Sequence, residues 1–174
     1  MTAKRILVLG GIRSGKTALA ESLVTSSGLP VVYVATATAA DDEMAKRIRR
    51  HQDSRPRDWG VSEVPVELAA ELARHSIETE PPQLLIDCMS LWVSNLLYAG
   101  NHVFDRERSA FLAAVQTYPG SLVVVSNEVG LGTIGMDPLT RRFCDELGWL
   151  NQALARACDQ VVMSVAGLPL TLKG

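Results

Sequence analysis

The sequence predicts an α/β fold in which helices cover both faces of a mostly parallel β-sheet. Short apolar runs rich in β-branched residues alternate with helical stretches throughout the 174 residues. These runs are almost continuously hydrophobic, which is typical of strands that are buried on both faces. A glycine-rich loop directly follows the first run. Strands that alternate with helices also favour right-handed crossovers between parallel strands.

Five apolar runs are the expected parallel strands, over residues 6–9, 31–35, 84–87, 122–126 and 161–165. Residues 168–172 alternate after a turn at Gly167, which predicts an antiparallel strand at one edge of the sheet. No internal repeat, low-complexity tract or linker divides the chain. A single nucleotide-binding domain over residues 1–174 is therefore expected.

Six helices are expected between these strands, over residues 16–26, 40–54, 65–76, 88–99, 105–117 and 138–158. The last helix has an apolar residue at every third or fourth position, which predicts a single buried stripe. The stripe consists of Leu139, Phe143, Leu147, Leu150, Leu154 and Cys158.

The loop after the first strand has the pattern G-x-x-x-x-G-K-[ST] of a phosphate-binding loop (P-loop). It consists of Gly10, Gly11, Ile12, Arg13, Ser14, Gly15, Lys16 and Thr17. The glycines allow backbone N–H groups to turn toward phosphate oxygens, and the N-terminus of the next helix adds partial positive charge. Lys16 is placed to reach the β- and γ-phosphates, and the Thr17 hydroxyl to bind Mg²⁺. Because strand, loop and helix follow in the required order, the motif predicts a nucleoside triphosphate site in a RecA-like P-loop domain rather than an ordinary turn.

Composition argues against several classes of function. The formal net charge of −2, without a basic block, argues against a nucleic-acid partner. The first apolar run is too short for a signal peptide, and no stretch of about 18 apolar residues could span a membrane. Cys88, Cys144 and Cys158 are widely spaced and lack a C-x-x-C pair, which favours small apolar side chains over disulfides or zinc ligands. A cytoplasmic protein is therefore predicted.

Polar residues at strand ends are the first candidates for chemistry, because open α/β sheets bind ligands at that edge. Asp87 ends one run and is favoured as a Walker-B carboxylate that helps to hold Mg²⁺, ahead of a helix N-cap. Glu128 is similarly placed, and a functional and a structural role are equally consistent with the pattern. The glycine-rich loop over residues 130–135 fits a substrate loop or a plain connection equally well.

The three histidines differ in how well their sequence context supports a functional role. His75, near a predicted helix end, and His102, in a polar loop, are expected to be solvated. His51 follows one lysine and three arginines between residues 46 and 50, which would form a cationic face suited to a triphosphate. From the pattern alone, a solvated helix face remains the favoured interpretation of this stretch.

Five ordered blocks resemble the bifunctional adenosylcobinamide kinase/adenosylcobinamide-phosphate guanylyltransferase family of cobalamin biosynthesis. The blocks cover residues 8–17, 33–63, 84–97, 123–152 and 165–173. They contain, in the family's order, GGIRSGKT, YVATATAADDEMAKRIRRHQDSRP with Trp59 and Glu63 beyond it, LLIDCMSLWVSNLL, VVVSNEVGLG, RRFCDELGWLNQALA and VAGLPLTLK. Ordered matches over nearly the whole chain are far more specific than a P-loop alone.

This resemblance implies two reactions on one corrinoid. ATP or GTP phosphorylates the aminopropanol hydroxyl of adenosylcobinamide, and GTP then transfers GMP to that phosphate, which gives adenosylcobinamide-GDP and pyrophosphate. The motif D-x-E-M-x-x-R-I-x-x-H places the guanylylated histidine on His51, where some relatives have a His-His pair instead of Arg50-His51. A neutral imidazole is a suitable nucleophile near neutral pH.

The resemblance also implies which residues form the site. Lys16 and His51 are the expected catalytic residues, and Thr17 and Asp87 the expected Mg²⁺ ligands. Besides the P-loop, the nucleotide site is expected to include Thr36, Ala37, Thr38, Gln52, Asp53, Ser54, Arg55, Glu63 and Asp87. Residues 133–138 depart from the family's pattern. A small homo-oligomer, for example a trimer, is expected.

Three other functions compete with this interpretation. A P-loop kinase for another small molecule would need Lys16, Thr17 and Asp87 but not His51. A regulatory GTPase would normally carry an N-K-x-D motif, which does not occur here, and the D-x-x-G match at residues 145–148 lies inside a predicted helix. An adaptor with a vestigial nucleotide site fits poorly with an intact Lys16-Thr17 pair.

Overall fold

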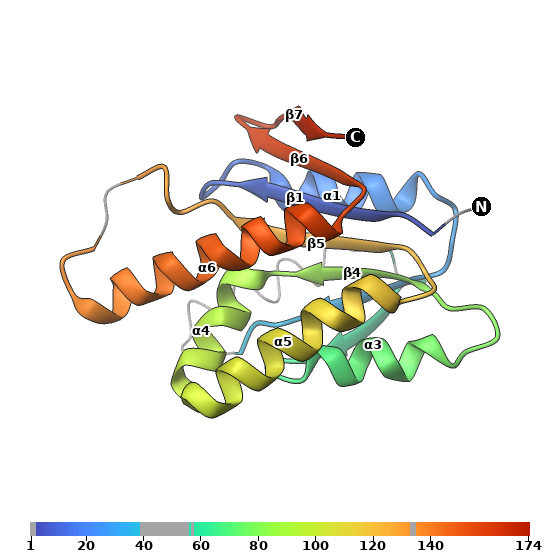
Figure 1. Ribbon diagram of the computed structural model, residues 1–174. Coiled ribbons are helices and arrows are strands. Elements are labelled where there is room, and N and C mark those ends of the chain that lie inside the picture. The colour runs from blue at the N-terminus through green and yellow to red at the C-terminus, as the bar shows by residue number, and fades with distance from the viewer. Residues whose placement is uncertain (1–2, 39–55, 57, 133–134) are drawn as a thin grey trace.

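The computed structural model describes residues 3–38, 56, 58–132 and 135–174. Its centre is a seven-stranded sheet with the strand order β3-β2-β4-β5-β1-β6-β7 (Figure 1). The strands are β1 (Arg5–Gly10), β2 (Val31–Ala35), β3 (Gly60–Glu63), β4 (Gln83–Asp87), β5 (Leu122–Asn127), β6 (Gln160–Val165) and β7 (Leu168–Lys173). Neighbouring strands are parallel except β6 and β7, which are antiparallel. The predicted parallel strands and the antiparallel edge strand are confirmed.

The carboxyl ends of the central strands are aligned. Gly10 of β1 lies opposite Asn127 of β5, and Ala35 of β2 lies opposite Asp87 of β4. β5 separates the strand that leads into the P-loop from the strand that ends in Asp87. The polar residues that follow these strands therefore share one edge of the sheet, where α/β proteins bind their ligands.

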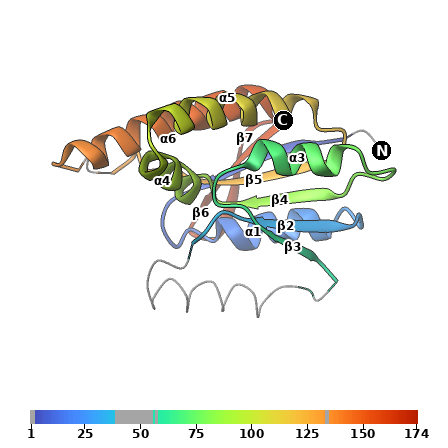
Figure 2. The ribbon, with the colours of Figure 1, turned by 90° about the horizontal axis from the view of Figure 1, so that it is seen from below.

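Helices cover both faces of the sheet, as predicted (Figures 1 and 2). They are α1 (Lys16–Thr25), α3 (Leu68–Ser76), α4 (Met89–Ala99), α5 (Asn101–Thr117) and α6 (Pro138–Ala157). Figure 2 shows α1 below the sheet and the other four helices above it. The larger core, under these four helices, includes Trp92 of α4 and Phe111 of α5, whose ring centroids are 5.0 Å apart.

β1 shows why the strands are continuously apolar. Leu7 and Leu9 belong to the larger core, whereas Ile6 and Val8 belong to the smaller core that includes Ala20 of α1. Successive side chains of a strand point to opposite faces, so a strand with a core on each side needs apolar residues at every position. Each fully buried side chain of this size contributes about 1.5–3 kcal/mol.

The structure adds one strand that the sequence did not indicate. β3 pairs with β2 at the edge of the sheet, and its four residues are mostly exposed. Only Val61 in this segment is both apolar and β-branched, so the usual signal of a buried strand is missing. The helix predicted over residues 40–54 lies outside the described residues.

Two helices begin at other positions than predicted. α3 begins at Leu68 rather than at residue 65, because the carbonyls of Pro65 and Val66 accept hydrogen bonds from the side chains of Asn95 and Trp92. α5 begins at Asn101 rather than at residue 105, directly after Gly100, whose φ of +100° separates it from α4. A glycine is suited to this conformation because it has no Cβ.

The predicted buried stripe of α6 is confirmed from Leu147 onward. Leu147, Leu150 and Leu154 are fully buried, and Cys158 lies just beyond the helix end and is 2% exposed. The stripe is wrong at its beginning, because Leu139 is 50% exposed. Figure 1 gives the reason, since the first turns of α6 extend past the carboxyl edge of the sheet. Among the described residues, no helix is long and apolar enough to cross a membrane.

Candidate nucleotide site

The P-loop connects the end of β1 to the start of α1. Gly15 has a φ of +89° and occupies the N-cap position of α1, a backbone conformation that favours glycine. A Cβ atom on Gly10 would lie 2.9 Å from the carbonyl oxygen of Ser164, so this position also requires glycine. The first N–H groups of α1 have no partners within the helix and can bind an anion.

The end of β6 and the β6–β7 turn contact the P-loop through two hydrogen bonds. The carbonyl oxygen of Ser14 accepts hydrogen bonds from the Ser164 hydroxyl at 2.7 Å and from the Gly167 N–H at 2.8 Å. In a trans peptide, the C=O of Ser14 and the N–H of Gly15 point in opposite directions. The two donors therefore turn the Gly15 N–H away from the β6–β7 turn. Neither Ser164 nor Gly167 was predicted as part of the site.

Lys16 folds back over the loop that precedes it. Its Nζ donates a hydrogen bond to the carbonyl oxygen of Gly11 at 3.1 Å, and the residue is half-buried. The positive charge is thus held over the P-loop, near the first N–H groups of α1. This arrangement suits a polyphosphate, because charge and N–H donors act on the same oxygens.

Asp87, at the end of β4, contacts the last residue of the P-loop motif. Its Oδ2 accepts hydrogen bonds from the Thr17 hydroxyl and from the Tyr33 hydroxyl, each at 3.0 Å. The N-cap of α4 is Cys88, without a side-chain capping bond, so Asp87 does not serve as the helix cap that the sequence left open. A carboxylate and a hydroxyl at hydrogen-bond distance are the oxygen ligands that Mg²⁺ prefers. These residues therefore fit a magnesium ion.

The loops after β2 and β4 are joined at the same edge. The buried Thr36 hydroxyl donates to the carbonyl oxygen of Cys88 at 2.7 Å and accepts from the Cys88 N–H at 2.8 Å. Asn95 of α4 donates to the carbonyl oxygen of Thr36 at 2.8 Å. Glu63 ends β3 opposite Ala35 and is exposed. The structure thus places Thr36 and Glu63 on the edge that carries Asp87.

The rest of the predicted nucleotide site is divided between described and undescribed residues. Ala37 is half-buried and Thr38 is exposed, directly after Thr36. The predicted residues His51, Gln52, Asp53, Ser54 and Arg55 lie outside the described residues.

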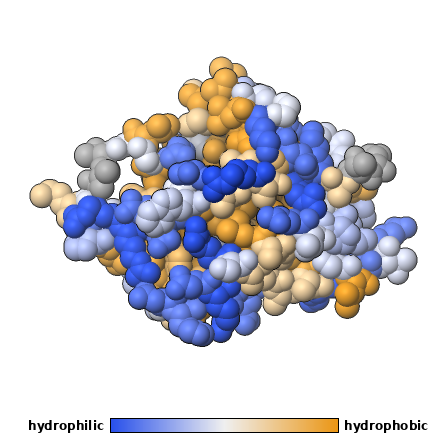
Figure 3. Space-filling view, in the orientation of Figure 1, coloured by the Kyte–Doolittle hydropathy of each residue, from blue (hydrophilic) through white to orange (hydrophobic). Residues whose placement is uncertain are grey.

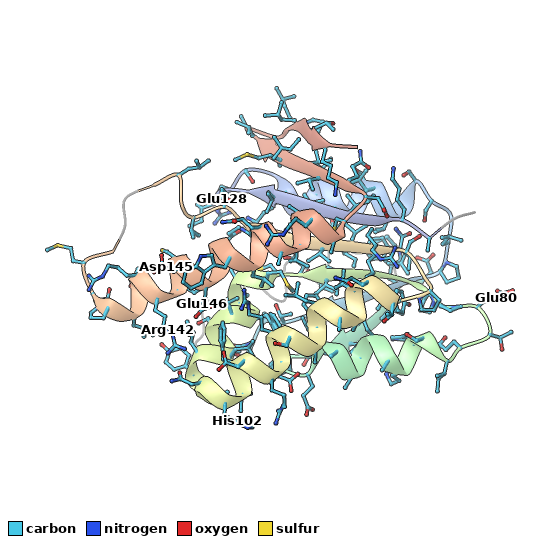
Figure 4. All side chains as sticks on the ribbon, viewed as in Figure 1. Glu80, His102, Glu128, Arg142, Asp145 and Glu146 are labelled. Atoms are coloured by element: carbon cyan, nitrogen blue, oxygen red, sulfur yellow. The ribbon has the colours of Figure 1, made fainter. Side chains whose placement is uncertain are left out.

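Glu128 and Asn127 lie beside the P-loop, at the end of β5. The Glu128 N–H donates to the carbonyl oxygen of Gly10 at 3.1 Å, and its Oε1 accepts from the Gly130 N–H at 3.0 Å. Figure 4 shows Glu128 at the carboxyl edge and Glu80 at the opposite end of the molecule. The Oδ1 of Asn127 is buried and has no hydrogen-bond partner among the described residues. Asn127 was not predicted as a site residue. Its place at the end of a strand, directly before Glu128, is the pattern in the sequence that could have indicated it.

The expectation that His75 is solvated is wrong. His75 is 4% exposed, and its Nε2 lies 3.2 Å from Glu71 Oε1 while its Nδ1 contacts Glu78. Glu71 lies one helical turn before His75, and Glu78 lies just beyond the end of α3, so a carboxylate faces each ring nitrogen and allows the ring to be buried. His102 is exposed, as predicted, but it lies at the start of α5 rather than in a loop, and Figure 4 shows it at the bottom of the molecule, away from Glu128.

The cysteines behave as small, mostly apolar side chains. All three are free thiols, and Cys158 is buried while Cys88 and Cys144 are half-buried. Burial raises the pKa of the Cys158 thiol to about 11, and burial also raises the pKa of Cys88. Both thiols are therefore protonated at neutral pH and poor nucleophiles.

A P-loop between β1 and α1, bonded to a carboxylate at the end of β4, defines a nucleotide-binding α/β protein of the P-loop class. The family model of cobinamide kinase/cobinamide phosphate guanyltransferase, CobU, matches residues 6–172. The chain therefore belongs to this family, whose description names a kinase and a guanyltransferase activity. The resemblance inferred from the five sequence blocks is confirmed.

Individual relatives agree with the family assignment. The chain is 48% identical over 172 residues to the bifunctional adenosylcobalamin biosynthesis protein CobP of Pseudomonas aeruginosa, with 98% of both chains covered. It is 36% identical over 186 residues to the corresponding CobU of Salmonella typhimurium, covering 97% of this chain and 99% of the relative. A solved protein of Pyrococcus horikoshii OT3 has a TM-score of 0.55 over 100% of this chain and 88% of its own, at 13% identity. That likeness shows the fold alone.

Proposed function

We propose that this chain phosphorylates adenosylcobinamide with ATP or GTP and then guanylylates the product, with both reactions in one domain. The observation that carries the kinase half is the Thr17–Asp87 hydrogen bond of 3.0 Å at the P-loop. It occurs in a chain that the family model matches over residues 6–172. The two reactions build the nucleotide loop of cobalamin, and the protein acts in the cytoplasm.

In the first reaction, the aminopropanol oxygen attacks the γ-phosphorus of the nucleotide. The bond between this phosphorus and the β–γ bridging oxygen breaks, the nucleoside diphosphate leaves, and the hydroxyl proton passes to solvent. Lys16 and the N-terminal amides of α1 hold the transferred group and balance its charge. Thr17 and Asp87 hold Mg²⁺, which, when bound, screens the charge of the phosphates.

In the second reaction, an imidazole nitrogen of His51 attacks the α-phosphorus of GTP and pyrophosphate leaves. A phosphate oxygen of adenosylcobinamide phosphate then attacks the same phosphorus and displaces the imidazole, which forms the diphosphate bond of adenosylcobinamide-GDP. Dividing the transfer into two displacements lowers each barrier. The support for His51 is the motif D-x-E-M-x-x-R-I-x-x-H together with the family match.

Recognition of the guanine nucleotide involves the strand-end loops. Glu63 lines a cavity of about 430 Å³ between β3 and α3. A carboxylate at this place can accept hydrogen bonds from the N–H groups of guanine. The neighbouring Thr36, Ala37 and Thr38 follow β2 at the same edge. Gln52, Asp53, Ser54 and Arg55 complete the proposed site on the basis of the sequence alone.

The protein forms a small homo-oligomer in this proposal. Leu168, Leu170 and Leu172 alternate along the edge strand β7 and are 71%, 53% and 54% exposed. Figure 3 shows the corresponding apolar patch at the top of the molecule. A sheet edge with apolar side chains is a surface that soluble proteins usually cover. Light scattering is expected to show that the wild-type protein has a multiple of the mass of one chain and that Leu170→Asp has a smaller mass than the wild type. A wild-type protein with the mass of a single chain contradicts the proposed oligomer.

Covalent labelling tests the division of labour between the two reactions. Incubation with α-³²P-labelled GTP and Mg²⁺ is expected to leave an acid-labile, base-stable label on the protein, because a phosphoramidate hydrolyses in acid. His51→Ala is expected to lose the label and the guanylyltransferase activity but to keep the phosphorylation of adenosylcobinamide. Full labelling of this variant, or loss of both activities in a folded protein, contradicts the proposal.

His102→Ala is the matched control for this experiment. His102 is exposed on α5 and removing its ring is expected to change neither the label nor the stability. His75→Ala is also expected to keep the label, but it lowers stability because it leaves the buried Glu71 carboxylate without one of its partners. A mapped label on either of these histidines would remove His51 from the mechanism.

A further inference from the structure

A groove between α4 and α6 opens at the same carboxyl edge as the P-loop. It has a volume of about 350 Å³, and its walls come from α4 and from the first turns of α6. Asn127, at the end of β5, also lines it. No P-loop residue lines this groove, and neither does any of the predicted nucleotide-site residues that the structure describes.

One residue that lines the groove, Asn127, adjoins the start of the P-loop. Asn127 lies opposite Gly10, the first P-loop residue, in the β1–β5 register. The next residue, Glu128, donates its N–H to the Gly10 carbonyl at 3.1 Å. A group bound in the groove can therefore extend past Asn127 toward the phosphates held by Lys16. An acceptor that attacks the γ-phosphorus must approach from the side of the phosphates away from the P-loop.

The walls of the groove suit a neutral molecule that has both apolar and amide groups. None of the described residues that line the groove carries a charge at neutral pH. The apolar side is made by leucines and aromatic rings, including Leu139, Phe143 and Tyr98, and the polar side by hydroxyls such as those of Ser94 and Thr140. By contrast, the cavity beside β3 and α3 is lined by several charged residues.

At the groove, two large side chains are exposed to solvent and one buried oxygen lacks a hydrogen-bond donor among the described residues. Tyr98 is 81% exposed and Leu139 is 50% exposed, and they lie on the two walls of the groove. The buried Oδ1 of Asn127 has no donor among the described residues. A ligand with methyl groups and primary amides along its rim would cover Tyr98 and Leu139 with the methyl groups. One of its amides would donate an N–H to the Oδ1 of Asn127. The α6 wall is fixed by its cap, since Asp137 accepts from the Thr140 N–H at 2.8 Å.

We propose that the α4–α6 groove binds one edge of the corrin ring of adenosylcobinamide and directs its aminopropanol arm toward the γ-phosphate. A corrinoid has methyl groups and neutral amide side chains around its ring, which match the uncharged walls. A cavity of about this size holds a drug-sized molecule, so only part of the macrocycle enters it. This assignment rests on the proposed function, because it presupposes that the acceptor is a corrinoid.

Substitutions at the exposed rim test the assignment without disturbing the core. Binding of adenosylcobinamide is measured without nucleotide by equilibrium dialysis, and the KM for adenosylcobinamide and the Kd for ATP are measured separately. Tyr98→Ala and Leu139→Ser are each expected to raise the corrinoid Kd and KM about tenfold and to change the ATP Kd less than twofold. Leu29→Ser is the matched control, because Leu29 is 39% exposed and precedes β2 at the opposite edge of the sheet.

The outcomes separate this assignment from the proposed function. If the wild-type protein neither binds nor phosphorylates adenosylcobinamide, both are overturned. If it phosphorylates adenosylcobinamide and the two groove variants keep wild-type corrinoid Kd and KM values, only the groove assignment is overturned. A loss of ATP affinity equal to the loss of corrinoid affinity also overturns it, since the groove would then belong to the nucleotide site.

Discussion

Ser164→Ala is expected to weaken nucleotide binding, although Ser164 lies on β6 and outside the P-loop motif. Its hydroxyl donates to the Ser14 carbonyl at 2.7 Å, and the residue is 1% exposed. Because this carbonyl and the Gly15 N–H belong to one peptide plane, the hydrogen bond fixes the direction of an amide in the phosphate-binding loop.

The size of the effect follows from the partners that remain. A neutral buried hydrogen bond contributes about 0.5–1.5 kcal/mol, and 1.4 kcal/mol is about a tenfold change in an equilibrium constant. The Gly167 N–H still holds the Ser14 carbonyl at 2.8 Å after the substitution. We therefore expect a partial loss, with ATP and GTP Kd values about two- to fivefold higher and unfolding stability lower by about 1 kcal/mol.

Calorimetric titration with ATP and GTP, together with thermal unfolding, measures both effects. Ser126→Ala is the matched control, because Ser126 is also a buried strand serine but its hydroxyl donates at 2.6 Å to Asn151 and not to a P-loop residue. This control is expected to lose stability and to bind nucleotides normally. Wild-type nucleotide affinity in Ser164→Ala, or an equal loss in Ser126→Ala, would refute the peptide-plane argument.

Three further substitutions test other parts of the site and fold. Lys16→Ala is expected to abolish phosphorylation of adenosylcobinamide in a folded protein, since the lost charge costs several kcal/mol in a water-poor site; near-normal activity in a kinase assay removes Lys16 from the reaction. Asp87→Asn is expected to raise the Mg²⁺ concentration needed for half-maximal activity, whereas an unchanged Mg²⁺ titration with only a lower melting temperature indicates a structural residue. The hydrogen bond from Arg74 holds the pKa of Glu71 below its ordinary value of 4.5. The ionised Glu71 side chain therefore stabilises the fold fully above pH 4.5, and this stabilisation is lost as the pH falls through the pKa of Glu71 in the folded protein. Unfolding measured against pH is therefore expected to show a shallower acid limb in Glu71→Gln, and an identical limb contradicts this role.

Local patterns in the sequence predicted most of the fold. The runs that form β1 and β5 are continuously apolar because both faces of these strands are buried, and the P-loop glycines are fixed by backbone geometry. β3 escaped prediction because an exposed edge strand of four residues needs no apolar pattern. Leu139 was misplaced because periodicity does not reveal where a helix passes the edge of its sheet.

Contacts between distant residues account for what could not be predicted at the site. The Ser164–Ser14 bond joins residues 150 positions apart, and nothing near either serine indicates it. The burial of His75 depends on contacts of its two ring nitrogens with Glu71 and Glu78. The sequence shows both glutamates near His75, but a histidine near a predicted helix end is more simply interpreted as solvated. The groove between α4 and α6 depends on how two helices pack, which their separate patterns do not specify.

The central position of β1 has a consequence for synthesis on the ribosome. Arg5 pairs with Leu122 on one side and Ile6 pairs with Gln160 on the other, so β1 is translated long before β5 and β6, the two strands that flank it. Pairing between such distant segments is slow to form. Until then Leu7 and Leu9, which belong to the larger core, lack their native partners on the nascent chain, a state that favours capture by chaperones and exposes the chain to aggregation.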